Sequence, residues 1–184
     1  MQYSVLLKTM TPGDELILRL PAEDEASEFL RAHHATSPDV PSFLHCYNDG
    51  MSLSEYLQVL ATMREGTNLP SGYVPETFLF AFVGPRIVGR VAIRHALNRV
   101  LEREGGHIGY VVVPEFRRRG YATRMLALAL RIAHEQLGID DVLLVCADSN
   151  VGSICVIERN GGVLQDVVRV DNSDAPLRRF RIRR

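Results

Sequence analysis

The sequence predicts an α/β fold, arranged as one domain over residues 1–184. Three observations favour this fold class. The stretch His107–Thr123 has the pattern of a buried strand, a loop with one glycine, and the start of a helix. The best amphipathic helix of the chain follows over Tyr121–Leu137, where apolar residues recur at helical spacing. The run Asp141–Ala147 is then apolar through its core, as a buried parallel strand is.

The other elements follow from turn and cap signals. Residues 1–13 are expected as a loose N-terminal arm, or the first ten of them as an added edge strand, before a strand at Glu15–Leu20. A helix is expected over Ala22–His34, and Ser52 or Ser54 caps the next one. Later strands are expected at Thr77–Val83, Ile87–His95, Ile108–Val113, Val163–Val170 and Arg178–Ile182, with a helix from Ser149 or Asn150 to Arg159 before the last two.

Composition limits the classes of function. Hydrophobic residues make up 46% and charged residues 23% of the chain, as in a water-soluble globular protein. The formal net charge of −1 indicates neither nucleic acid nor a membrane as a partner. The cysteines Cys46, Cys146 and Cys155 are odd in number and lack metal-ligand spacing, so we expect free thiols, no metal site and a cytoplasmic location.

The loop Arg117–Gly120 and the helix after it have the chemistry of a phosphate site. Backbone N–H groups of such a loop point outward, and the helix N-terminus adds a partial positive charge. Gly120 allows a ligand to approach the backbone because it has no Cβ. The three successive arginines make the entrance basic.

Arg117-x-x-Gly120-x-Ala122 also resembles the Q/R-x-x-G-x-G/A motif of the GNAT superfamily of N-acetyltransferases. The context agrees, because the motif lies between an apolar strand and an amphipathic helix, and Asn150 and Asn160-Gly161-Gly162 follow the next strand. The resemblance covers roughly residues 77–170, and the segments GGHIGY and IERNGG are similar to a bacterial group of predicted acetyltransferases.

This resemblance implies a mixed, mostly antiparallel twisted sheet of about six or seven strands, with helices on both faces. It also implies acetyl-CoA as the cofactor. The family's strand before the phosphate loop carries a bulge and splays from the next parallel strand, leaving a wedge for the pantetheine arm. The residues that would hold the cofactor are Tyr110, Val111, Val112, Arg117, Arg118, Arg119, Gly120, Tyr121, Ala122, Thr123 and Asn150, the last of which is equally suited to a plain N-cap.

Catalytic candidates are His107 and Tyr110 on the central strand. An imidazole that titrates near neutral pH suits a base for the acceptor amine, although His107 also fits a strand-end histidine bonded to a neighbour. Glu104 is a second candidate for the base. His95 and Asn98 are expected beside Tyr110 on the acceptor side. Surface or capping roles are expected for His33, His34, His45 and His134.

One position departs from the family pattern. Many relatives have a tyrosine seven residues after the asparagine, where it acts as an acid to the leaving thiolate, and this chain has Ile157. Cys155 and Ser153 are the candidates to replace this tyrosine as the acid, but a buried thiol in a helix is more often a packing residue. The sequence therefore predicts acetyl transfer without assigning a general acid.

The expected function is N-acetylation of a primary amine of a small molecule or peptide, by direct attack in a ternary complex. A non-catalytic acyl-CoA sensor is the alternative. The arginine-rich tail Arg178–Arg184 also suits a nucleic-acid partner, but its alternation favours an edge strand. A homodimer is expected by analogy only. Loop aspartates that could attract an amine, or simply form turns, are Asp39, Asp49, Asp171 and Asp174.

Overall fold

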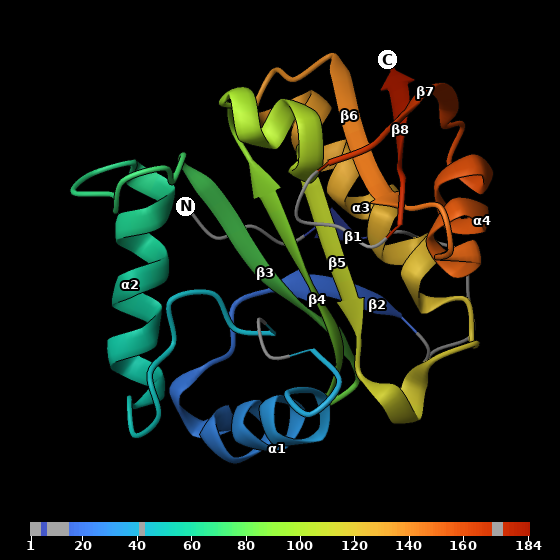
Figure 1. The fold of residues 1–184 in the computed structure, drawn as a ribbon. Coiled ribbons are helices and arrows are strands. Elements are labelled where there is room, and N and C mark those ends of the chain that lie inside the picture. Colours follow the sequence, from blue (N-terminus) through green and yellow to red (C-terminus); the bar gives the residue numbers. More distant parts are fainter. Residues whose placement is uncertain (1–4, 7–14, 41–42, 171–174) are drawn as a thin grey trace.

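The computed structural model describes residues 5–6, 15–40, 43–170 and 175–184, and these form two antiparallel sheets with helices around them (Figure 1). The first sheet has the order β1-β2-β3-β4-β5 and the second the order β6-β8-β7. The predicted α/β fold class is confirmed. The strands are β1 (Val5–Leu6), β2 (Leu16–Arg19), β3 (Glu76–Val83), β4 (Arg86–Arg94), β5 (Ile108–Val112), β6 (Asp141–Ala147), β7 (Val163–Val168) and β8 (Leu177–Arg183).

The N-terminal strand β1 corresponds to the added edge strand, which was expected as the alternative to a loose arm. Val5–Leu6 pairs antiparallel with Ile17–Leu18 of β2, so the added edge strand exists at these two residues. The predicted chain break at Thr11–Gly13 lies outside the described residues. The assignment of residues 1–184 to one domain stays a prediction.

The α-helices are α1 (Ala26–Thr36), α2 (Leu53–Glu65), α3 (Tyr121–Gln136) and α4 (Val151–Arg159). The cap predicted at Ser52 is confirmed, since its hydroxyl accepts from the N–H of Glu55 in a capping box. The predicted start at Ala22 is wrong. Residues Glu23–Glu25 form a 3₁₀ turn instead, because the Glu25 carboxylate accepts the Ala22 N–H at 2.8 Å and the Arg19 guanidinium at 2.6 Å.

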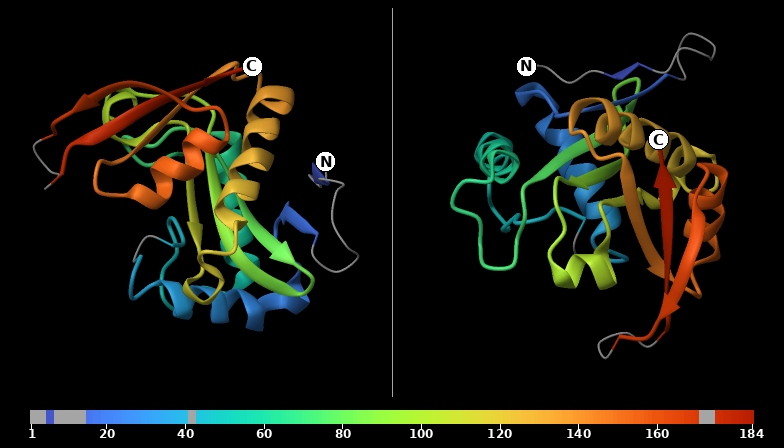
Figure 2. Two further views of the ribbon diagram at one scale, coloured as in Figure 1. Left: turned by 90° about the vertical axis from the view of Figure 1, so that its right-hand side faces the viewer. Right: turned by 90° about the horizontal axis from the view of Figure 1, so that it is seen from above.

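The two sheets meet where β5 and β6 touch at one end and separate at the other. At the touching end the His107 N–H donates to the Leu143 carbonyl at 2.7 Å, and Gly106 forms a bridge with Leu144. Residues on both strands are buried there, whereas Gly109–Val112 and Val145–Ala147 are only half-buried. Figure 2 shows the second sheet turned away from the first. This opening is the predicted wedge.

The expected bulge in β5 is absent. The register between β4 and β5 runs without a shift from the Ile93–Ile108 pair to the Gly89–Val112 pair. Gly89 permits this regular pairing, because a Cβ at this position would lie 2.4 Å from the Val111 carbonyl oxygen. The wedge therefore forms because β6 takes β8 as its hydrogen-bonded partner, and not because β5 is kinked.

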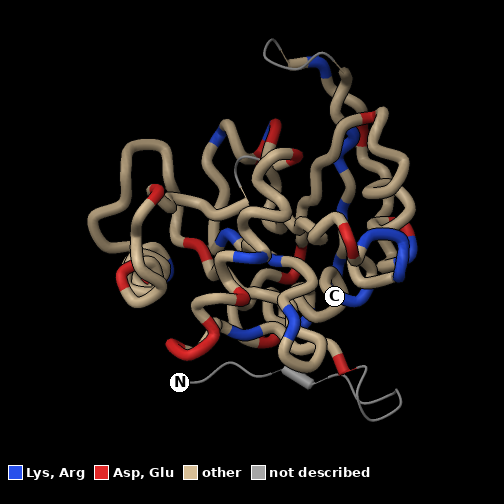
Figure 3. The backbone as a smooth tube through the Cα atoms, turned by 90° about the horizontal axis from the view of Figure 1, so that it is seen from below, with Lys and Arg blue, Asp and Glu red and all other residues tan. Residues whose placement is uncertain are grey.

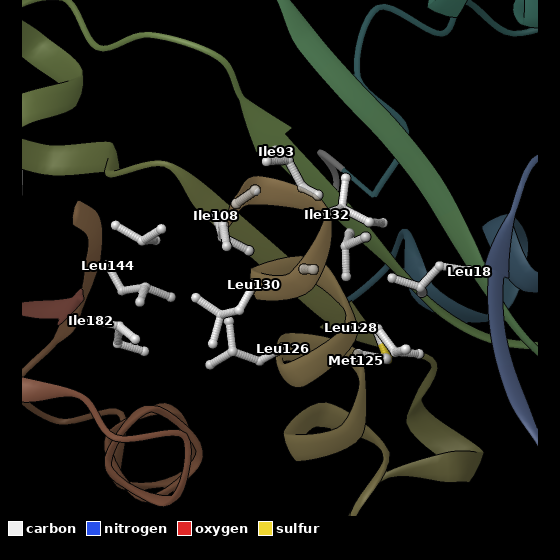
Figure 4. Close-up of a cluster of buried hydrophobic side chains, with 14 of the residues drawn as sticks. Leu18, Ile93, Ile108, Met125, Leu126, Leu128, Leu130, Ile132, Leu144 and Ile182 are labelled. Atoms are coloured by element: carbon white, nitrogen blue, oxygen red, sulfur yellow. The ribbon is translucent and has the colours of Figure 1, made fainter. Parts of the chain in front are cut away.

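Helix α3 holds the two sheets together through one apolar core. Its buried side chains contact residues of β2, β4 and β5 from the first sheet and of β6 and β8 from the second (Figure 4). A second core on the opposite face of the first sheet contains aromatic side chains of α1, α2 and β3. Burial on both faces of β3 and β4 gives the site a rigid support. Within the described residues, no helix combines the length and the apolar character that crossing a membrane requires.

Candidate functional site

Gly120 sits at the N-cap of α3 in the left-handed conformation, with φ of +77°. Glycine adopts this conformation without strain. A Cβ added there would meet no atom within 4 Å, so the space beside the backbone is open. Arg117–Arg119 before it are exposed and form the longest continuous basic stretch of the chain (Figure 3). The predicted loop is thus accessible and positively charged.

The start of α3 differs from the starts of α2 and α4. Ser52 caps α2, and the Asn150 side chain caps α4 by accepting the Ser153 N–H at 3.0 Å. Among the residues that the structure describes, none caps α3 with its side chain, and the first turn of α3 has no acidic residue. The first N–H groups of this 16-residue helix therefore have no capping side chain, and they add to the helix dipole. This arrangement favours an anion.

Other contacts brace the loop. The Arg117 Nη1 lies 2.7 Å from the Asp39 carboxylate, and its Nε donates to the Val112 carbonyl at 3.3 Å. Asp39, expected on the acceptor side, is thus beside the phosphate loop. Glu115 pairs with Arg31 of α1 at 2.5 Å, which joins the loop to the second core.

The edge of β5 that faces β6 is open along part of its length. The Val113 N–H donates to the Val88 carbonyl at 3.0 Å, and the Arg94 N–H donates to the His107 carbonyl at 2.8 Å. Backbone groups alternate in an antiparallel ladder, so Val111 faces β4. Tyr110 and Val112 turn their N–H and C=O groups toward β6, with which β5 forms no ladder in the described residues. The Val112 carbonyl accepts from Arg117, so the groups left for an extended ligand are the N–H and C=O of Tyr110 and the N–H of Val112.

The side chain of Tyr110 crosses the gap. It packs against the core of α3, and its hydroxyl lies 3.5 Å from the Ser153 carbonyl of α4. Burial raises the pKa of Tyr110 to about 12, outweighing the opposite effect of this hydrogen bond. The phenol is therefore protonated at neutral pH, and it can donate a proton but not act as a base. It lies in the wedge, whereas the pocket described below is on the other face of the first sheet.

His107 lies at the touching end of the wedge and is 9% exposed. Its Nδ1 accepts the Leu143 N–H at 2.9 Å, so the neutral ring carries its proton on Nε2. Burial, together with the charge of Arg181, lowers the pKa of His107. Protonation of this ring would break the bond to Leu143. The role of His107 as a base stays a prediction. In this role the ring would lose its hydrogen bond to Leu143 each time it takes up a proton. The candidate Glu104 lies in the π-helical turn Leu101–Gly105 just before β5.

Asn150 and Ile157 on α4 are placed as the sequence suggests. Asn150 is an N-cap, and a contact with a cofactor arm stays a prediction. Ile157 is 1% exposed in the α3 core, so no acid occupies that position. A Cβ on Gly162 would lie 2.3 Å from the Ile157 side chain, so the isoleucine fills the adjacent space.

The other face of the first sheet has a pocket, lined by both apolar and charged residues, that was not predicted. It has a volume of about 380 Å³, and a larger hollow of about 710 Å³ beside α2 shares Cys46 and Met63 with it. His45, interpreted from the sequence as a surface or capping residue, lies half-buried in it and bonds to Glu76 at 2.9 Å. Residues lining the smaller pocket include His45, Cys46, Tyr73, Glu76 and Arg94.

His95 and Asn98, which were expected on the acceptor side, lie near this pocket but are not among its lining residues. Asn98 donates to the Gly72 carbonyl at 2.9 Å and so ties the β4–β5 connection to the pocket loop. The His95 Nε2 lies 2.8 Å from the Thr77 hydroxyl. Asp171 and Asp174 lie outside the described residues. A charged residue directly before an apolar strand, as Glu76 is, was the available signal for the pocket.

Comparisons with known proteins agree with this geometry. The family model described as an acetyltransferase (GNAT) domain matches residues 15–163, which confirms the resemblance seen in the sequence. No curated protein matches the chain by sequence.

Solved structures share the fold at low identity. RimJ of Mycobacterium smegmatis, in complex with a CoA disulfide, matches with a TM-score of 0.67 and 17% identity over 98% of this chain and 86% of its own. The microcin self-immunity acetyltransferase MccE, in complex with acetyl-CoA and AMP, matches with a TM-score of 0.63 and 15% identity over 95% and 98%. A ribosomal-protein alanine acetyltransferase from Vibrio fischeri matches with a TM-score of 0.67 and 12% identity over 97% and 96%.

Proposed function

Because the chain belongs to the GNAT acetyltransferase family, we propose that it transfers an acetyl group from acetyl-CoA to a primary amine of a small molecule or peptide. The acyltransferase class and the cofactor acetyl-CoA follow from the family, in agreement with neighbours that were solved with acetyl-CoA or CoA. The nitrogen acceptor, and direct attack in a ternary complex without a covalent enzyme intermediate, are the parts that we propose.

One observation carries the proposal: the uncapped start of α3 adjoins the open edge of β5. A ligand with an anionic group and an extended amide-bearing arm fits this combination. The space beside Gly120 admits the anionic group close to the backbone. The residues that we propose to hold acetyl-CoA are Tyr110, Val111, Val112, Arg117, Arg118, Arg119, Gly120, Tyr121, Ala122, Thr123 and Asn150.

The strand supplies a fixed hydrogen-bond donor for the reaction. When bound, acetyl-CoA supplies a thioester carbonyl that an amine attacks. A backbone N–H of Tyr110 or Val112 on the β6 side suits the carbonyl oxygen as its negative charge develops. The ladder with β4 and the His107–Leu143 contacts hold this donor in place, so it needs no reorganisation.

The CoA thiolate that leaves in this reaction takes up one proton at most, so a single donor is enough. The hydroxyl of Tyr110 lies in the gap between β5 and α4 and stays protonated at neutral pH. We assign it the role of donor to the thiolate, since the usual acid position holds the buried Ile157. Replacing Tyr110 by Phe tests this role, because it keeps the ring in the core and removes only the hydroxyl.

The second candidate function is a non-catalytic acyl-CoA sensor. The one observation that favours it is the buried Ile157, which stands where the family usually has an acid. Both candidates require cofactor binding, and turnover separates them. Calorimetric titration with acetyl-CoA, CoA and dephospho-CoA is expected to show one saturable site per chain. Absence of binding by all three ligands would overturn both candidates.

Turnover is then measured as CoA thiol release with a panel of acceptors. The panel contains peptides with a free α-amine, lysine-containing peptides, simple diamines and amino alcohols, with N-blocked and alcohol analogues as controls. Acceleration by amines but not by alcohols is expected for an N-acetyltransferase. Saturable binding without acceleration by any acceptor would favour the sensor.

A further inference from the structure

The smaller pocket, which is taken as the acceptor pocket under the proposed function, brings together side chains from four separate parts of the chain. His45 comes from the α1–α2 connection, Tyr73 from the α2–β3 connection, Glu76 from β3 and Arg94 from β4. Glu76 is only 4% exposed, so its charge is enclosed by these partners. A buried carboxylate is costly unless it is paired, which makes this cluster an organised site rather than an incidental one.

The geometry of His45 and Glu76 fixes one form of the imidazole. The His45 Nδ1 lies 2.9 Å from the Glu76 Oε1, and the ring packs against Phe78 with centroids 5.3 Å apart. An ionised carboxylate only accepts hydrogen bonds, so Nδ1 must carry the proton that it donates. The neutral ring then has its lone pair on Nε2, which has no hydrogen-bond partner among the described residues. A carboxylate that orients a histidine in this way is a common means of preparing a base.

Glu76 is held in its ionised form. Burial acts to raise the pKa of Glu76, but the hydrogen bond from His45 and the neighbouring positive charges outweigh it and hold the pKa below its usual value. One of these charges is Arg94, whose Nε lies 3.5 Å from the Glu76 Oε2. Glu76 interacts with the titratable or charged groups His45, Tyr56, Tyr73, Arg90, Arg94 and His95, and Cys46 lines the same pocket.

Arg94 also links this cluster to the cofactor side. Its Nη1 donates to the Gly106 carbonyl at 3.0 Å, and Gly106 forms the bridge to Leu144 at the touching end of the wedge. A chain of direct contacts thus runs from His45 through Glu76 and Arg94 to the junction of β5 and β6. The acceptor pocket and the open edge of β5 therefore keep a fixed relation to each other.

His45 is oriented in the opposite sense to His107. The Nδ1 of His107 is occupied as an acceptor by a backbone N–H, so its neutral ring offers no lone pair. The Nδ1 of His45 is a donor to a carboxylate, so its neutral ring offers Nε2. Two histidines in one fold thus have different proton chemistry because their partners differ.

We infer that His45 is the base that removes a proton from the acceptor amine, and that Glu76 is the positioning residue that orients it. This inference rests on the proposed N-acetyltransferase function. An acceptor ammonium gives one proton to Nε2 of His45, which later passes it to solvent. The amine nitrogen forms a bond to the acetyl carbon while the carbon–sulfur bond breaks, and the second amine proton ends on the CoA thiol.

The test compares His45→Ala with His34→Ala, an exposed histidine on α1, in the full chain. Acetyl-CoA affinity by calorimetry is expected to be unchanged in both variants. With the best amine of the panel, His45→Ala is expected to lower kcat by roughly 100-fold or more. Added imidazole is expected to restore part of the kcat of His45→Ala, which a purely structural role would not allow.

A second measurement does not depend on turnover. The ¹⁵N shifts of the neutral His45 ring in the wild-type chain are expected to show the Nδ1–H tautomer. In Glu76→Gln this preference is expected to weaken, with kcat lowered more than KM is raised. An Nε2–H tautomer in the wild type would overturn the inference even if every variant failed to fold.

The outcomes for this inference and for the proposed function can be told apart. Wild-type turnover, with His45→Ala retaining the rate of the wild type, would overturn the role of His45 alone. Loss of acetyl-CoA binding in His45→Ala without rescue by imidazole would mark His45 as structural and overturn it too. Saturable acetyl-CoA binding by the wild type without turnover on any amine would overturn the transferase proposal, and this inference with it.

Discussion

The cofactor side and the acceptor side of the candidate site are built in different ways. The proposed cofactor side relies mainly on backbone groups of one continuous stretch, Tyr110–Thr123, with Asn150 beyond it. The acceptor side uses side chains such as His45, Glu76 and Arg94, which come from distant parts of the chain. A backbone site depends on conformation and open space, whereas a side-chain site depends on which partners the fold brings together. Different substitutions should therefore disable the two sides.

The largest effect is expected on the cofactor side from Gly120→Val. A β-branched residue is strained at a φ of +77°, and its side chain would fill the open space beside the first N–H groups of α3. Loss of about two charge-assisted hydrogen bonds, at about 1.5–3 kcal/mol each, lowers acetyl-CoA affinity by roughly 100-fold or more. Calorimetric titration measures this loss.

Gly138→Val is the matched control for that variant. Gly138 follows the other end of α3, also has a positive φ, of +66°, and also has open space around it. Its substitution imposes a similar backbone strain far from the loop, so acetyl-CoA affinity should stay near the wild-type value. Equal affinity of the Gly120 and Gly138 variants would contradict the assignment of the phosphate site.

The next largest effect is expected at the touching end of the wedge, where the His107 ring accepts the buried Leu143 N–H. His107→Ala leaves this donor unsatisfied, which costs about 1–3 kcal/mol of unfolding free energy. In His107→Asn the side-chain oxygen can replace Nδ1 as the acceptor, so most of the stability should remain. Chemical denaturation measures both values.

The same pair of variants also separates the two roles of His107. If His107 only joins β5 to β6, His107→Asn should keep its turnover, whereas a catalytic base would not survive this substitution. A large loss of kcat in His107→Asn with normal stability would return the base to His107. That result would argue against His45.

A smaller effect is expected in the pH dependence of stability. Burial is the main cause that lowers the pKa of His33, His95 and His107 below the usual value of about 6.5. As the pH falls below about 6.5, the unfolded chain binds protons that the folded chain does not, so the free energy of unfolding decreases. The stability that these three histidines contribute is fully present above about pH 6.5. It is lost as the pH falls toward their lower pKa values in the folded chain. Denaturation at intervals between about pH 7.5 and pH 5 should show the decrease.

His107→Asn is again the informative comparison, since it removes one of the three titrating groups. Its stability should fall less steeply with acidification than that of the wild type. An identical slope would mean that His107 binds protons equally in the folded and unfolded states, against the direction inferred from its burial.

What the sequence could predict follows from the same contrast between the two sides. The strand, loop and helix over His107–Leu137 were predictable because their signals are local: an apolar run, a glycine with a positive φ, and helical spacing. The His45–Glu76 contact joins residues 31 positions apart, and nothing near His45 distinguishes it from a surface histidine. Its chemistry exists only after the first sheet has formed.

The division into two sheets was beyond the sequence for a related reason. The hydrophobic pattern of β6 shows that it is buried, but not that β8 rather than β5 is its partner. The early start predicted for α1 failed because Glu25 forms side-chain bonds to Ala22 and Arg19 that compete with the first helical turn. The first outcome was decided by a pairing between distant segments, and the second by local side-chain bonds that compete with the helix.

The smallest effect is expected from Arg117→Ala at the rim of the phosphate loop. The Arg117 side chain is 42% exposed, and its ion pair with Asp39 is open to solvent. Exposed pairs contribute about 0–1 kcal/mol, so acetyl-CoA affinity should fall only by roughly fivefold or less, and the difference should shrink as salt is added. Arg131→Ala on α3 is the control, because its side chain is equally exposed but pairs with Glu135 at the far end of the helix from Gly120. A loss in Arg117→Ala as large as that in Gly120→Val would mean that side-chain charge, and not the backbone of α3, holds the cofactor, and the contrast between the two sides would no longer stand.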